Sequence, residues 1–267
     1  MRTLAPLLLL LLVVRSAQAK IVTQPVEYKQ GDTTLEGYLA YDDSISGKRP
    51  GVLIAHQWTG LTDYEKMRAR MLAELGYVAF AVDIYGKGIH PKPPRESGEL
   101  VAKYKGDRAL LRARMKAGLD ELLKNPNVDP KRVGAIGYCF GGSAVLELAR
   151  SSADIAGVVS FHGGLDNPNP DDAKNIRCAV LALSGGNDPN VPPAQVDAFL
   201  KEMQACPTQW DFVAYGHAVH SFTQKDAGDD PSKGAAYNAH ADRESWEAMK
   251  NFFANAFGQT PSPAKDK

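Results

Sequence analysis

The sequence of 267 residues has few cysteines and no excess of charge of either sign. Its three cysteines, Cys139, Cys178 and Cys206, are too few for a disulfide-stapled scaffold or a cysteine-rich zinc module. Lys and Arg together number 31, as do Asp and Glu, so no basic surplus favours nucleic acid or an anionic membrane. With 44% hydrophobic and 23% charged residues, the composition excludes fibrous and disordered classes.

The sequence also lacks an apolar run long enough to span a bilayer, which takes about 20 residues. The single candidate, residues 7–14, follows Met1-Arg2 and precedes Ala17-Gln18-Ala19. A basic start, a short apolar segment and an Ala-x-Ala end are typical of a secretory signal peptide. We therefore expect residues 1–19 to be removed and the protein to be periplasmic or secreted. Residues 20–267 should form one domain with no membrane segment.

Residues 20–257 alternate β-rich apolar runs with longer amphipathic runs, the pattern of an α/β fold with a mostly parallel sheet and helices on both faces. A hairpin around Gly31-Asp32 should join strands 21–30 and 33–41 at one edge of a sheet of about seven or eight strands. The other expected strands are residues 52–56, 77–83, 132–138, 155–161, 178–183 and 209–215. The expected helices are residues 64–75, 142–150, 193–205 and 239–257. Residues 100–124 should be mainly helical, and residues 84–98 should form a long Gly- and Pro-rich loop.

The residues between one predicted strand and the next helix read Gly137-Tyr138-Cys139-Phe140-Gly141-Gly142. This Gly-x-Nuc-x-Gly pattern is that of a nucleophile elbow, with cysteine as the nucleophile. Flanking glycines suit so tight a turn, and the helix N-terminus favours a thiolate. A glycine-rich turn holding an inert buried cysteine is the alternative for the motif taken alone.

Two further residues follow later strands in the order that α/β-hydrolases require, which is nucleophile, acid and then histidine. Asp188 follows strand 178–183, and His220 follows strand 209–215. Each alone has an ordinary interpretation, since Asp188-Pro189 suits a turn and a loop histidine is commonly a surface residue. Their order and position together predict a catalytic triad of Cys139, His220 and Asp188 at one edge of the sheet.

The sequence resembles the dienelactone hydrolase family of α/β-hydrolases over nearly all of residues 26–257. The resemblance implies that Cys139 is the nucleophile, His220 the base and Asp188 its orienting acid. It also implies an oxyanion hole formed by the backbone N–H groups of Phe140 and Trp58, with no cofactor and no metal. The motifs that carry the resemblance are His56-Gln57-Trp58-Thr59-Gly60, Asp83-Ile84-Tyr85-Gly86, the elbow, Gly185-Gly186-Asn187-Asp188 and His220-Ser221-Phe222.

The sequence departs from the family pattern at the substrate pocket. Gln57 replaces a glutamate that interacts with the resting thiol in characterised members. Lys87 and Gln224 stand where those enzymes have two arginines that bind a substrate carboxylate, so dienelactone itself is an open question as substrate. These three residues and Tyr85 are our candidates for lining the pocket.

We expect a monomeric dienelactone hydrolase-like or carboxylesterase-like enzyme that cleaves small esters or lactones through a thioester on Cys139. Because the triad specifies only attack on a carbonyl, a thioesterase or peptidase-like hydrolase is an alternative. A binding protein on the same fold with weak catalysis is another. Histidines and aspartates near His217 lack metal-ligand spacing, so we expect no metal site.

Cys178 and Cys206 are expected at the end of the sheet opposite to Cys139, one at a strand start and the other at a helix end. In an exported protein, a disulfide between them is a further hypothesis.

Overall fold

The computed structural model describes residues 20–258, which form an eight-stranded sheet with helices on both faces. The predicted signal peptide, residues 1–19, lies outside the described residues. The strand order is β1-β2-β4-β3-β5-β6-β7-β8, in which β1, β2 and β4 pair antiparallel and the remaining pairs are parallel. The strands are β1 (Ile21–Gln30), β2 (Thr33–Asp42), β3 (Arg49–Ala55), β4 (Val78–Val82), β5 (Val128–Tyr138), β6 (Gly157–Phe161), β7 (Ala179–Gly185) and β8 (Trp210–Tyr215).

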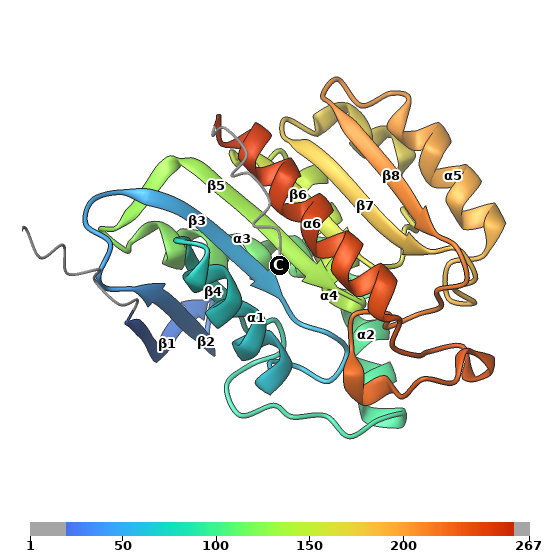
Figure 1. The fold of residues 1–267 in the computed structure, drawn as a ribbon, viewed down its shortest axis with the longest axis horizontal. Helices are drawn as coiled ribbons and strands as arrows, with labels where there is room; N and C mark the ends of the chain where they lie inside the picture. The colour runs from blue at the N-terminus through green and yellow to red at the C-terminus, as the bar shows by residue number, and fades with distance from the viewer. Residues whose placement is uncertain (1–19, 259–267) are drawn as a thin grey trace, which may run out of the picture.

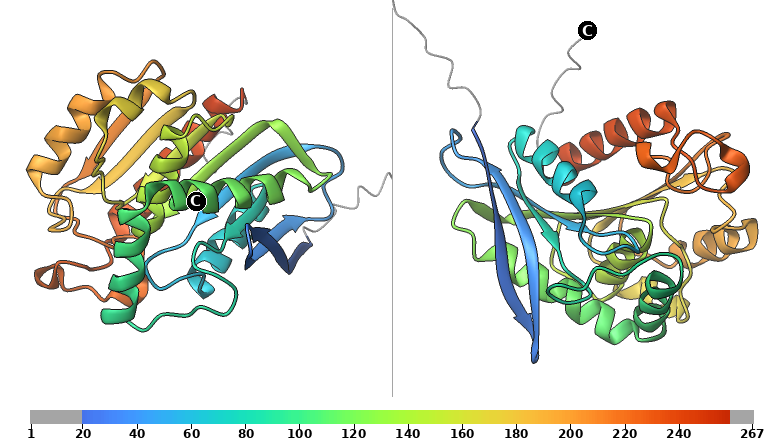
Figure 2. Two further views of the ribbon diagram at one scale, coloured as in Figure 1. Left: turned by 180° about the vertical axis from the view of Figure 1, so that it is seen from behind. Right: turned by 90° about the horizontal axis from the view of Figure 1, so that it is seen from below.

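Six α-helices cover the two faces of this sheet (Figure 1). One apolar core lies between the sheet and α1 and α6, and the other lies between the sheet and α3, α4 and α5 (Figure 2). The helices are α1 (Asp63–Glu74), α2 (Arg95–Gly106), α3 (Arg108–Leu123), α4 (Phe140–Arg150), α5 (Pro193–Met203) and α6 (Ala239–Ala256). Because both faces are covered, β3, β4 and β6 are buried along their whole length, which explains their continuous apolar sequences.

The predicted edge hairpin and the predicted mostly parallel sheet are confirmed. Residues 31 and 32 form the turn between β1 and β2, which pair from Ile21 with Asp42 to Gln30 with Thr33. The structure also contains three short 3₁₀ helices that the sequence pattern did not predict. They are Pro170–Asn175, Lys225–Ala227 and Pro231–Lys233. Within the described part of the chain, no helix combines the length and apolar character of a membrane span.

Residues 100–124 are mainly helical, as predicted, but they belong to two helices. Asp107 separates the two with an extended backbone (φ −120°, ψ 82°), and its carboxylate accepts a hydrogen bond from the Leu110 N–H at 2.9 Å. Asp107 thereby caps α3 and ends α2, a preference of aspartate that competes with helix continuation. The first of the two helices begins at Arg95, inside the segment predicted to be a loop.

Helix α4 is buried at every position, including two charged side chains. The Arg150 guanidinium lies 2.8 Å from a Glu202 carboxylate oxygen on α5 and 3.0 Å from the Glu147 carboxylate. The attraction between paired charges offsets the desolvation cost of burying arginine and glutamate. The helix that follows the cysteine is therefore fixed by ion pairs as well as by apolar contacts.

The turn from β5 to α4 contains the tightest backbone contacts around Cys139. Cys139 has φ 55° and ψ −117°, a conformation that costs free energy for a residue with a side chain. A Cβ on Gly137 would lie 2.0 Å from the Gly141 carbonyl oxygen, and one on Gly141 would lie 2.1 Å from the Ala55 carbonyl oxygen. Both contacts are with backbone, so neither glycine can carry a side chain without moving the turn or β3.

Replacing Gly141 with alanine should therefore destabilise the protein by about 3 kcal/mol or more, as expected for a methyl group forced into packed backbone. Gly106→Ala is the matched control, because Gly106 ends α2 and a Cβ there meets nothing within 4 Å. Alanine in a helix should leave stability equal or raise it by about 0.5–1 kcal/mol. Urea unfolding measures the stability of both variants. Equal midpoints for Gly141→Ala and the unmutated protein would contradict the packing argument.

Candidate active site

The structure brings Cys139, Asp188 and His220 to the carboxyl edge of the sheet. They follow β5, β7 and β8 respectively, and the arrowheads of these parallel strands point toward the same edge (Figure 1). Open α/β sheets place ligand sites at this edge. The order of the three residues, each after a strand, therefore places them in one region of the fold.

His220 and Asp188 form a buried hydrogen-bonded pair. The His220 Nδ1 lies 2.8 Å from Asp188 Oδ2, and the Asp188 side chain has no exposed surface. The other carboxylate oxygen, Oδ1, accepts a hydrogen bond from the Asn190 N–H at 2.8 Å. Because an ionised carboxylate accepts only, Asp188 holds a proton on Nδ1 and leaves Nε2 of His220 free to face Cys139.

The environment of His220 favours its charged form. Burial alone would lower its pKa, but the negative charge of Cys139 and the hydrogen bonds and charge supplied by Asp188 and Cys139 raise the pKa of His220 to about 10. Opposite charge on neighbouring groups thus stabilises a protonated His220 ring beside Cys139 and Asp188. The pair can supply both a nucleophile and an acid.

A cavity of about 500 Å³ opens over these residues. Trp58 and Phe140 line it together with Cys139 and His220. The backbone N–H groups of Trp58 and Phe140 donate to no other group in residues 20–258, and the N–H of Phe140 is the first in α4. Unpaired donors beside the thiol can bind the oxygen of a carbonyl under attack. The complete lining is Trp58, Gly98, Val101, Lys105, Cys139, Phe140, Ser143, Gly164, Asn190, His220, Ser221 and Ala235.

The four residues predicted to line the pocket lie outside this lining. Gln57 is buried, and its backbone N–H and side-chain amide donate to Glu65 at 3.2 and 3.4 Å. Tyr85 lies behind the wall, where its hydroxyl donates to the Trp58 carbonyl at 3.1 Å and its ring stacks on Phe140. These two residues support the wall of the cavity instead of facing the substrate.

Lys87 and Gln224 line other hollows of the described structure. Lys87 forms ion pairs with Glu27 on β1 and Glu36 on β2, which direct its ammonium toward the antiparallel edge of the sheet. Gln224 lines a separate hollow beside Tyr64 of α1. Sequence alignment with a family motif places a residue in a loop, but ion pairs with distant strands decide where its side chain points.

Lys105 is the cation that does line the cavity, and sequence analysis missed it. It lies on α2, and its ammonium is 2.5 Å from Asp166 Oδ1, while Arg108 binds the other oxygen at 2.7 Å. Ser143 and Asn190 are further polar lining residues that were not predicted. Recognising Asp107 as a helix cap would have given α2 its own direction, with Lys105 in its last turn.

Cys178 and Cys206 are free thiols, so the structure does not contain the hypothesised disulfide. The Cys206 sulfur lies 3.3 Å from the Thr208 hydroxyl, which itself donates to the Cys178 carbonyl at 2.7 Å. Burial, together with nearby Cys206, raises the pKa of the Cys178 thiol to about 12. Cys178 is accordingly a poor nucleophile, which leaves Cys139 as the cysteine placed for reaction.

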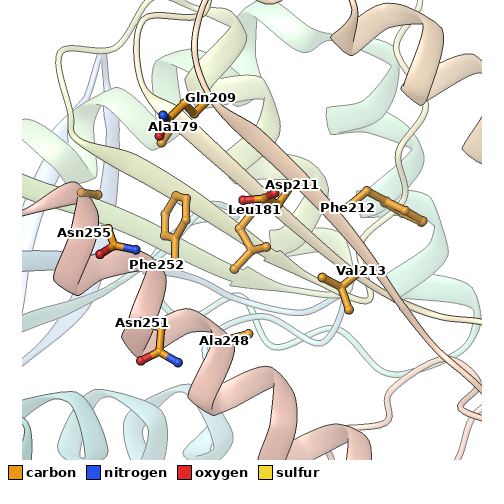
Figure 3. Close-up of a pocket in the computed structure, with 11 residues that line it drawn as sticks. Ala179, Leu181, Gln209, Asp211, Phe212, Val213, Ala248, Asn251, Phe252 and Asn255 are labelled. Atoms are coloured by element: carbon orange, nitrogen blue, oxygen red, sulfur yellow. The ribbon is translucent and has the colours of Figure 1, made fainter. Parts of the chain in front are cut away.

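A second hollow, of about 390 Å³, lies between α6 and strands β7 and β8 (Figure 3). Its labelled side chains include Phe252, Asn251 and Asn255 from the helix and Leu181 and Asp211 from the strands. No cysteine, histidine or serine belongs to the described lining of this hollow. It therefore lacks the groups for nucleophilic catalysis that the cavity at Cys139 contains.

The fold, with a cysteine at the elbow and a paired histidine and aspartate on later loops, defines an α/β-hydrolase. The family model of the dienelactone hydrolase family matches residues 35–257. The chain belongs to that family and is an ester-hydrolysing enzyme.

Three relatives illustrate the match. A dienelactone hydrolase-like promiscuous phosphotriesterase from metagenomic libraries has a TM-score of 0.85 and 40% identity, covering 90% of this chain and 100% of its own. A Yersinia pestis protein provisionally named carboxymethylenebutenolidase is 26% identical over 238 residues, 84% of each chain. The dienelactone hydrolase of Anabaena variabilis, 23% identical with a TM-score of 0.62, covers 86% of this chain and 97% of its own and supports the fold.

Removing the negative charge of Cys139 should lower the pKa of His220 from about 10 toward the ordinary value for histidine. Cys139→Ser keeps the shape of the side chain but stays neutral at these pH values. The His220 ring therefore loses the negative charge that raises its pKa. Histidine NMR titration measures the change, with Cys206→Ser as the control. An unchanged His220 titration in Cys139→Ser would show that the thiolate does not interact with this ring.

Proposed function

We propose that the protein hydrolyses small esters or lactones through a Cys139–His220–Asp188 triad and a thioester intermediate. The observation that carries the proposal is the hydrogen-bonded His220–Asp188 pair next to Cys139 in a cavity of about 500 Å³. Nucleophile, base and orienting acid in this arrangement constitute the machinery of acyl transfer.

The first half-reaction forms the thioester. The Cys139 sulfur attacks the ester carbonyl, and the N–H groups of Phe140 and Trp58 bind the developing oxyanion. When the C–O bond breaks, Nε2 of His220 gives its proton to the departing alkoxide. Asp188 keeps the other ring nitrogen protonated and the ring oriented throughout.

The second half-reaction releases the acid. Nε2 of His220, now neutral, takes a proton from a water molecule, whose oxygen attacks the thioester carbonyl. The C–S bond then breaks, and the sulfur leaves as a thiolate beside the imidazolium. The site thus returns to its starting charges.

Cys139→Ala should lower kcat/KM for p-nitrophenyl acetate by at least about 10³-fold, because the bond-forming atom is absent. Cys206→Ala is the matched control and should hydrolyse this ester as the unmutated protein does. Release of p-nitrophenol, followed by absorbance, measures both. Equal turnover by Cys139→Ala and the control would place the reaction elsewhere and overturn the proposal.

Lys105 is our candidate for the group that recognises an anionic part of the substrate, because Lys87 and Gln224 lie outside the cavity lining. Asp166 is shared between Lys105 and Arg108, so it does not use all three donors of the Lys105 ammonium. The remaining donors are available to a carboxylate in the cavity.

Lys105→Met should reduce kcat/KM about 10-fold for an ester whose acyl chain ends in a carboxylate, with less than a twofold effect on the methyl-capped analogue. Lys103→Met is the control, because Lys103 is on the same helix but lines a different hollow. Steady-state rates with p-nitrophenyl succinate and its methyl ester give the comparison. Equal losses on both esters would assign Lys105 a structural role.

A second candidate function is phosphotriester hydrolysis, which the name of the 40% identical relative reports for that protein. The same sulfur would attack phosphorus in place of carbon, and the same N–H groups would face the phosphoryl oxygen. If the site has this activity, a p-nitrophenyl phosphotriester will be cleaved by the unmutated protein and not by Cys139→Ala.

A further inference from the structure

His162 is a second buried histidine beside the candidate triad, and the proposed mechanism gives it no role. It follows β6, has no exposed surface and adopts a left-handed backbone with φ 40°. Its Nδ1 accepts a hydrogen bond at 3.1 Å from the backbone N–H of Cys139, which this ring shares with the Phe161 carbonyl at 3.0 Å. The centre of its ring lies 5.2 Å from that of His220, edge to face. His162 therefore contacts the backbone of the nucleophile and the ring of the base.

The second nitrogen of His162 contacts the loop that carries His220. Nε2 lies 2.8 Å from the Thr223 hydroxyl oxygen, and Thr223 is three residues after His220 in the chain. Since Nδ1 accepts from Cys139, the proton of the neutral ring must be on Nε2, which then donates to Thr223. The two hydrogen bonds fix a single tautomer.

The surroundings keep this ring neutral. Burial lowers the pKa of His162 well below its ordinary value, and the charges of His220 and Arg68 lower it further. A proton on Nδ1 would face the N–H of Cys139, donor against donor. The acceptor role of Nδ1 is therefore favoured over protonation of the ring.

Thr223 is itself held by two helices. Its hydroxyl lies 2.7 Å from the Tyr64 hydroxyl of α1, and its carbonyl accepts from the Arg68 guanidinium of α1 at 3.1 Å. Arg68 forms an ion pair at 2.7 Å with Asp242 of α6. The position of Thr223, and through it of the His220 loop, is thus set by the helices on one face of the sheet.

We infer that His162 and Thr223 are positioning residues whose hydrogen bonds, from Cys139 N–H to His162 to Thr223, set the separation between the nucleophile and His220. This inference rests on the proposed function. The connection joins two segments that β-sheet pairing does not join directly, because β6 and β7 lie between β5 and β8. Small errors in such a separation cost large factors in rate.

Thr223→Val tests the inference, because valine keeps the shape of threonine and removes the hydroxyl. We expect kcat for p-nitrophenyl acetate to fall about 10- to 100-fold with KM changed less than threefold, and Thr223→Ser to restore most of the rate. Rates are expressed per folded protein, measured by circular dichroism of each variant, so that loss of folded protein does not count as loss of kcat. Thr208→Val, which removes a hydroxyl bonded to the Cys178 carbonyl, is the control and should keep the unmutated kcat.

A double-mutant cycle with His162→Leu identifies the connection itself. If the two residues act through one another, the double variant will be about as slow as His162→Leu alone. Unmutated kcat in Thr223→Val, or multiplicative losses in the double variant, would overturn the inference. Should His162→Leu fail to fold, the comparison of Thr223→Val with Thr223→Ser decides alone. Failure of the proposed function is seen separately, as esterase activity that survives Cys139→Ala.

Discussion

The backbone turn at Cys139 is the constraint on which the rest of the site depends. A residue with φ 55° lies between a buried strand and a buried helix, with glycines where side chains would collide with backbone oxygens. The turn raises the sulfur above the sheet edge and leaves the first N–H groups of α4 without helical partners. The position of the sulfur, and the roles that we propose for it and for the Phe140 N–H, all depend on this one geometry.

Neighbouring charges and hydrogen bonds set the pKa of the two histidines beside this turn. Asp188 is buried against His220, and the charges and hydrogen bonds of Cys139 and Asp188 raise the pKa of His220 against the opposing effect of burial. His162 lies beside this pair but is kept neutral by its own hydrogen bonds and by the positive charge of its neighbours. Two histidines with rings 5.2 Å apart thus have their pKa values shifted in opposite directions by their surroundings.

Elements with strong local signals could be predicted from the sequence. The hairpin around Gly31-Asp32, the buried strands and the turn at Cys139 each depend on residues adjacent in the chain. The order of Cys139, Asp188 and His220 sufficed to place them at one sheet edge, because strand topology converts order into position. The family membership inferred from these motifs is confirmed by the family model.

The features that were not predicted have two causes, contacts between distant segments and a local helix cap. Lys87 turns toward Glu27 and Glu36, about which its own loop carries no information. The helix break at Asp107 came from a cap that competed with a helical pattern, and it brought Lys105 to the cavity. Cys178 and Cys206 lie near each other as expected but remain thiols, with the Cys206 sulfur beside the Thr208 hydroxyl. Proximity could be inferred, but side-chain direction could not.

The central claim is that an acyl group passes through the sulfur of Cys139. Rapid acid quenching of the reaction with p-nitrophenyl acetate, followed by peptide mass spectrometry, measures this directly. The account predicts an acetyl group on the peptide that contains Cys139, and on no other peptide, with a yield that falls as the substrate is exhausted. Turnover without acetylated Cys139 at any quench time, or acetylation of Ser143 in its place, would contradict it.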